Sequence, residues 1–183
     1  MKKATEVARC LISMMKDEAS GTEPEENDLT PLKLQKLLYY CQGYSLALTG
    51  KPVFEDEIEA WRLGPVVESV YHEYKRYNRK IIPYSSLESE PDETLKSIIR
   101  LVLSDKRLCS GEALSQATHR ERPWRESYKG DYVNAVIPQE LMKEYFSSEL
   151  LKREEDYKDE DEAWEKLAEP LSIRELEVLL EEI

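Results

Sequence analysis

The chain has 183 residues, enough for one domain with an ordinary hydrophobic core and a short extension. It carries 38 acidic and 26 basic residues, and a net charge of −12 disfavours general binding to nucleic-acid phosphates. No apolar run approaches the roughly 18 residues of a transmembrane helix, and no signal-peptide pattern opens the chain. We therefore expect a cytoplasmic protein that has no membrane partner.

The negative charge is concentrated at the C-terminal end. Residues 1–146 contain 21 basic and 24 acidic residues, whereas residues 147–183 contain 5 basic and 14 acidic residues. We therefore predict a domain over residues 1–149 and an acidic extension over residues 150–183. Within the extension, Ser172 and Glu175 form a capping box, which predicts a short amphipathic helix at the C-terminus. The sequence leaves open whether that helix docks on its own domain or on a partner.

Two amphipathic helices are predicted in the first fifty residues. Apolar residues at helical spacing predict a first helix over roughly residues 3–18. Thr30 as N-cap, Pro31 at the first helical position and Gly50 as the stop signal bound a second helix. Gly43 lies inside this second helix, which indicates that another part of the backbone passes close by.

The chain then changes its period. Alternating residues over 57–67 predict a short strand in a small antiparallel ribbon, and Pro65 is expected to begin a third helix. Further helices are predicted around Leu95–Val102, after Ser110, from Pro123 and from Pro138, with an edge strand in "VNAVIP". The predicted fold class is mainly α, a compact helical domain with a small β ribbon and an acidic helical extension.

The residue types used in catalysis are scarce. Cys10, Cys41 and Cys109 lie far apart among apolar residues, which indicates reduced core cysteines. No phosphate-binding, nucleophile-elbow or zinc-protease pattern occurs, and the two histidines, His72 and His119, lack a second ligand at metal spacing. We predict a protein that is not an enzyme, without catalytic residues, metal or cofactor. A Cys–His pair formed by His119 with Cys41 or Cys109, as in a hydrolase, stays an alternative.

Three motifs in the first two thirds of the chain resemble one known family. They are L-T-P-x-K-L-Q-K-L-L-Y-Y from Leu29, E-A-W-x-x-G-P-V from Glu59, and L-S-x-x-T-H from Leu114 followed by Pro123-Trp124. Their order and spacing over roughly residues 4–149 are similar to the Panacea domain, the SocA-like or GepA-like family of antitoxins and phage-associated proteins. The acidic extension lies outside this resemblance.

The resemblance implies an antitoxin of a toxin–antitoxin system with a role in phage defence. Such a protein neutralises its cognate toxin by direct binding or, in SocA-like members, by delivering it to a AAA+ protease, and the family is associated with many unrelated toxins. A DNA-binding autoregulator is an alternative, but the one basic cluster, "KRYNRK" at residues 75–80, is short and follows an aromatic helix face. An uncharacterised hydrolase is the second alternative.

The motifs contain candidate contact residues and candidate structural residues. We expect four residues of the second helix to face outward, Lys33, Gln35, Lys36 and Tyr40. The predicted partner-binding residues are Lys33, Lys36, Tyr40, Trp61, Arg62, His119 and Arg122. The residues predicted to be structural are Thr30, Pro31, Gly64, Pro65, Thr118, Pro123 and Trp124. For "THRERPW" we favour the structural interpretation, in which Thr118 bonds local backbone, Pro123 sets a turn and Trp124 fills the core. The alternative for Tyr39, Tyr40 and Trp61, which we favour for each of them taken singly, is that they close the edge of the core.

Overall fold

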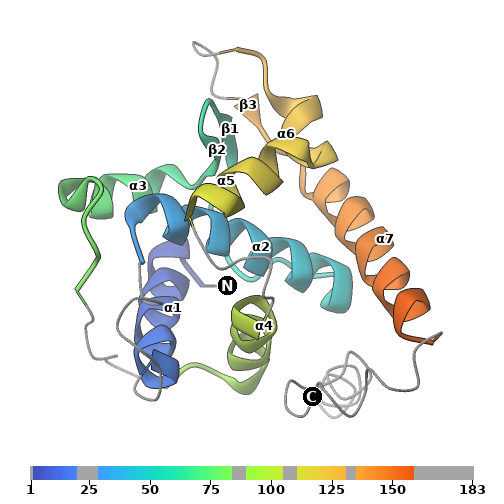
Figure 1. Ribbon diagram of the computed structural model, residues 1–183, viewed down its shortest axis with the longest axis horizontal. Coiled ribbons are helices and arrows are strands. Elements are labelled where there is room, and N and C mark those ends of the chain that lie inside the picture. The colour runs from blue at the N-terminus through green and yellow to red at the C-terminus, as the bar shows by residue number, and fades with distance from the viewer. Residues whose placement is uncertain (1, 20–28, 84–89, 105–110, 131–134, 159–183) are drawn as a thin grey trace.

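The computed structural model describes residues 2–19, 29–83, 90–104, 111–130 and 135–158 (Figure 1). The chain is mainly helical with one small antiparallel sheet, as predicted. Its elements are α1 (Ala4–Ala19), α2 (Pro31–Thr49), β1 (Glu59–Trp61), β2 (Gly64–Val66), α3 (Glu68–Tyr74), the 3-10 turn η2 (Lys75–Tyr77), α4 (Glu93–Ser104), α5 (Gly111–Arg120), α6 (Arg122–Ser127), β3 (Ala135–Val136) and α7 (Gln139–Lys158).

Helix α2 is the centre of the fold. The Thr30 side chain accepts a hydrogen bond from the Lys33 amide, Pro31 occupies the first turn and Gly50 ends the helix, as predicted. Every residue from Lys33 to Leu46 is buried. Neighbouring helices cover α2 and so bury it (Figure 1). Helices α1 and α4 lie on one side of α2, α5 lies on the other, and α7 packs beside it. A helix covered on several sides must bury its polar positions as well as its apolar ones.

Gly43 marks the place where α7 reaches α2. A methyl group added at Gly43 would lie 2.3 Å from the ring of Phe146, so only glycine leaves room for that ring. The ring of Phe146 meets those of Tyr39, Tyr40 and Tyr44 edge to face, with centroids 5.3 to 5.8 Å apart. The predicted close approach at Gly43 is real, but an aromatic side chain rather than a backbone makes it.

The sheet has the strand order β2-β1-β3, all antiparallel. Glu59 pairs with both Val66 and Val136, so the strand predicted in "VNAVIP" is an edge strand, as expected. The predicted helix start at Pro65 is wrong, because Pro65 lies within β2 and α3 begins at Glu68. An edge strand tolerates proline, since the missing amide hydrogen is not needed on the open side.

The other predicted helices carry their apolar residues inward. Val7, Leu11 and Ile12 of α1 are buried, as are Ile98 and Ile99 of α4. Cys10 and Cys41 are free and buried, whereas Cys109, Ser110 and the predicted C-terminal helix at residues 171–183 lie outside the described residues. Helix α7 continues through residue 150 and ends at Lys158.

We expect Gly43→Ala to lower the free energy of unfolding by about 1 to 3 kcal/mol, because the new methyl group must displace the Phe146 ring. Urea denaturation of both proteins measures this difference. Gly111→Ala is the matched control, since an added methyl group there meets its nearest atom at 3.4 Å. Equal losses at Gly43 and Gly111 would contradict the proposed tight contact.

Candidate protein-interaction site

Buried polar residues of α2 bind backbone groups between Lys51 and Val67, a segment that includes the β-hairpin formed by β1 and β2. The Gln35 side chain accepts a hydrogen bond from the Val67 amide at 2.7 Å and donates one to the Val67 carbonyl at 3.3 Å. Two turns further on, Gln42 binds the amide and the carbonyl of Phe54 in the same way. Each glutamine side chain thus binds both the N–H and the C=O of one residue, as a neighbouring strand would, and leaves neither backbone group without a hydrogen bond.

Lys36 is the most unusual of these side chains. It is 0% exposed, and its Nζ donates a hydrogen bond to the Pro65 carbonyl at 2.9 Å. Burial lowers the pKa of Lys36 to about 7, because an ammonium group loses its hydration there. Gly64 completes the site, since its φ of +99° favours glycine and an added methyl group would lie 2.6 Å from the Lys36 Nζ.

Helices α5 and α6 bind other backbone carbonyls of the same hairpin. Ser115 donates to the Leu63 carbonyl at 3.2 Å, the His119 Nε2 lies 2.9 Å from the Arg62 carbonyl oxygen, and Trp124 donates to the Trp61 carbonyl at 2.9 Å. Three consecutive carbonyls of the hairpin thus meet three side chains. The Nδ1 of His119 also contacts the Ser115 carbonyl, which orients the ring.

The remaining residues of "THRERPW" support this arrangement. Thr118 donates to the Ser115 carbonyl at 3.0 Å, Pro123 lies in the first turn of α6, and the Trp124 ring is buried. The Trp124 ring stacks on Tyr128 with centroids 4.6 Å apart and meets the His119 ring edge to face at 4.2 Å. The structural interpretation of this motif agrees with the burial and the contacts of its residues.

Several candidate contact residues are misplaced by the sequence interpretation. The expectation that Lys33, Gln35, Lys36 and Tyr40 face outward is wrong, because all four are buried. The error arises because α2 is covered on several sides, so a polar residue on it need not mark the solvent face. Tyr40 instead donates a hydrogen bond to the Glu121 carboxylate at 2.7 Å. His119 is half-buried and bound to the hairpin, which gives it a structural role.

Three other candidates retain accessible surface. Trp61 is half-buried, donates to Glu59 at 2.6 Å and packs edge to face on Tyr71 with centroids 4.9 Å apart. Arg62 is exposed in the hairpin turn. Arg122 is exposed on α6, where it forms ion pairs with Glu126 and Glu144.

The structure adds two surface residues that the sequence interpretation missed. Leu63 and Tyr71 are 61% and 36% exposed. We call Trp61, Arg62, Leu63 and Tyr71 the hairpin-tip surface. An apolar leucine directly before the turn glycine is a signal that could have identified Leu63, since two-residue turns are ordinarily polar. Tyr71 follows the buried Val67 and Val70 and precedes the buried Tyr74 at helical spacing, so the apolar periodicity does not indicate its exposure.

One small pocket lies apart from the hairpin, between α2, α5, α6 and α7. Its lining consists of Tyr40, Tyr44, Ala117, Glu121, Tyr145, Phe146 and Glu149. The volume is about 80 Å³, below the ~300–1,000 Å³ of sites that enclose a whole small ligand. In the described part of the chain, no three His, Cys, Asp or Glu side chains gather as metal ligands. No helix among the described residues is long and apolar enough to cross a membrane.

The comparison with known families bears on this arrangement directly. The family described as "Antitoxin SocA-like, Panacea domain" matches residues 34–125, half of the chain. The chain belongs to this family. Antitoxin SocA of Caulobacter vibrioides (strain NA1000 / CB15N) is 36% identical over 76 residues, which are 41% of this chain and 38% of that protein. The chain thus matches well under half the length of this curated relative. No solved structure matches it.

The Panacea region coincides with the hairpin and the side chains that hold it. It begins within α2 at Leu34 and ends within α6 at Arg125, so Gln35, Lys36 and Trp124 all lie inside it. Helix α7 lies outside the matched region, although its Phe146 packs against Gly43 of α2. The shared region therefore contains the hairpin and its supports, and a neighbouring segment completes the core.

We expect Trp124→Ala to lower the free energy of unfolding by about 3 kcal/mol or more, because the change removes a buried ring and the donor to the Trp61 carbonyl. Thermal and urea denaturation measure the loss. His119→Ala should cost less, and Arg125→Ala, at an exposed neighbouring position, should stay within about 0.5 kcal/mol of wild type. If Trp124→Ala had the same melting temperature as wild type, the structural role of Trp124 would be wrong.

The lowered pKa of Lys36 predicts a pH dependence of stability. Above pH 7 the folded protein loses the Lys36 proton, whereas the unfolded chain keeps it up to about 10.5, so stability rises with pH across this interval. Between pH 7 and 8.5 we expect a gain of about 1 to 2 kcal/mol in wild type relative to Lys36→Met. Urea denaturation at both pH values checks this, and parallel curves for the two proteins would contradict it.

Proposed function

We propose that this protein is an antitoxin that neutralises a cognate toxin by direct protein binding, and that the hairpin-tip surface contacts the toxin. Membership of the antitoxin SocA-like family supports the antitoxin role. The observation that carries the binding mode is the fixed hairpin, because five side chains, those of Gln35, Lys36, Ser115, His119 and Trp124, bind backbone groups of the hairpin or of Val67 directly after it.

The held backbone explains how a short turn can serve as a binding surface. Arg62 and Leu63 form a two-residue turn between β1 and β2, and both are exposed. Because the backbone is already ordered, binding costs little conformational entropy at the turn. Aromatic and arginine side chains make the largest contributions to many protein interfaces, and this surface supplies Trp61, Tyr71 and Arg62.

The proposal is for a protein that acts without catalysis. The buried polar side chains of the Panacea motifs bind backbone groups, which supports a scaffolding rather than a reactive role for them. The pocket of about 80 Å³ has room for a side chain rather than for a whole substrate of ordinary size. Both observations favour a binding protein over the hydrolase alternative.

Co-expression with the product of the adjacent gene tests the antitoxin role. We expect growth to be restored and the two proteins to co-purify. Immunoblotting of the toxin then separates two modes of neutralisation, because sequestration leaves its level unchanged, whereas delivery to a AAA+ protease lowers it. Failure to restore growth with both proteins present and soluble would contradict the antitoxin role.

Leu63→Asp tests the hairpin-tip surface. We expect toxin affinity to fall about tenfold or more with an unchanged melting temperature, because the leucine is exposed and contributes little to the core. Ile81→Asp is the matched control, since Ile81 is also exposed, at 55%, and lies outside the hairpin. Calorimetric titration measures both affinities. Equal affinities of the two variants would show that the toxin does not bind the hairpin tip.

A further inference from the structure

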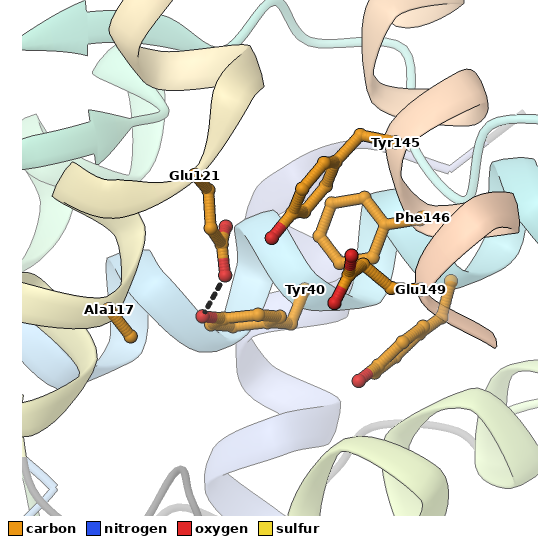
Figure 2. Close-up of a pocket in the computed structure, with 7 residues that line it drawn as sticks. Tyr40, Ala117, Glu121, Tyr145, Phe146 and Glu149 are labelled. Carbon is orange, nitrogen blue, oxygen red and sulfur yellow. Dashed lines mark hydrogen bonds between the residues drawn. The ribbon is translucent and has the colours of Figure 1, made fainter. Parts of the chain in front are cut away.

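The pocket between α2, α5, α6 and α7 has a composition suited to a cation. Two of its lining residues, Glu121 and Glu149, are carboxylates, and four, Tyr40, Tyr44, Tyr145 and Phe146, are aromatic. Figure 2 shows the carboxylates of Glu121 and Glu149 and the hydroxyl of Tyr145 directed toward a common space beside the Tyr40 ring. Aromatic faces together with carboxylates attract cations, because the π faces and the carboxylates are both negative.

Glu121 is bound within the pocket by a neutral donor. Tyr40 donates a hydrogen bond to the Glu121 carboxylate at 2.7 Å. Burial and this carboxylate raise the pKa of Tyr40 above its usual range, and they act in the same direction on Tyr39. Both hydroxyls therefore stay protonated, and the Tyr40 phenol remains a neutral hydrogen-bond donor to the Glu121 carboxylate. The hydroxyl of Tyr39 is itself buried and has no hydrogen-bond partner among the described residues.

The second carboxylate lies nearer to solvent. Glu149 forms an ion pair with Lys152 at 2.7 Å, and the Lys152 side chain is 66% exposed. An exposed pair within one helix is weak, so a cation that enters the pocket can share Glu149 with Lys152 or replace it. The pocket is thus negative at its inner end and accessible at its outer end.

We propose that this pocket receives one arginine side chain of the bound toxin, a proposal that rests on the function proposed above. A guanidinium group is flat, stacks on aromatic rings and can bind two carboxylates at once, which matches the Tyr40 ring and the pair Glu121 and Glu149. The volume of about 80 Å³ accommodates such a group but not a larger ligand. The chain's own segment 159–183, with 10 acidic and 2 basic residues, has the wrong net charge for this place.

The pocket can be tested without the toxin. We expect N-acetyl-arginine methylamide to shift the methyl resonance of Ala117, which lines the pocket, in a saturable titration. The citrulline derivative has nearly the same shape without the charge, and we expect it to cause no saturable shift. The lysine derivative should bind more weakly than arginine, since an ammonium group cannot stack or bind both carboxylates equally well. Equal shifts with arginine and citrulline would overturn the proposal.

Charge-removing variants connect the pocket to the toxin. Glu121→Gln removes the negative charge and keeps an acceptor for the Tyr40 hydroxyl. Combining it with Glu149→Gln gives a double variant that removes both charges and leaves the shape of the pocket nearly unchanged. We expect this double variant to lose the arginine-dependent shift and to bind the toxin about tenfold or more weakly. The control is Glu140→Gln, an exposed change on the same helix α7 but outside the pocket. Ala117→Leu is a second variant, which fills the pocket without changing its charge, and it should have the same effect.

The outcomes separate this proposal from the function on which it rests. If wild type does not bind the toxin at all, the proposed function fails, whereas the arginine titration still decides whether the pocket binds a guanidinium. If wild type binds the toxin and both the double variant and Ala117→Leu bind it equally well, the pocket proposal is wrong and the antitoxin function stands.

Discussion

The structure depends on how the backbone of the β-hairpin satisfies its hydrogen bonds. The sheet is only three short strands wide, so many of the polar groups around residues 61–67 have no neighbouring strand to bind. Side chains of α2, α5 and α6 supply the missing donors and acceptors instead. Each buried carbonyl left without a donor would cost about 1 to 3 kcal/mol, which explains why polar residues occupy the most enclosed helix of the fold.

This arrangement separates two tasks within one short segment. The backbone of the hairpin is held by side chains of the Panacea motifs, whereas the side chains of Arg62 and Leu63 point away from the core and are exposed. Substitution at the turn therefore leaves the scaffold intact. Under the proposed function, such a surface could change its partner without changing the fold.

The pocket divides between the shared region and the rest of the chain. Tyr40, Ala117 and Glu121 lie within residues 34–125, while Tyr145 and Glu149 come from α7 outside that region. Helix α7 is anchored by Phe146 against Gly43, so the contact that completes the core also brings Glu149 toward Glu121. A site built in this way can differ in charge between members of the family that share the same motifs.

The sequence by itself determined the features that have local causes. The cap at Thr30, the proline in the first turn, the stop at Gly50 and the buried stripe of α4 follow from hydrogen bonds and spacing within one element, and all are present. Only the tertiary structure decided which polar residues are exposed. Lys36 and Gln35 have the sequence character of surface residues, but neighbouring helices cover α2, so their surroundings depend on contacts made across the fold. Pro65 is a second example of such long-range contacts. The preference of proline for the first turn of a helix predicts a helix start at this position. The pairing with β1 and the hydrogen bond from Lys36 place it in a strand instead.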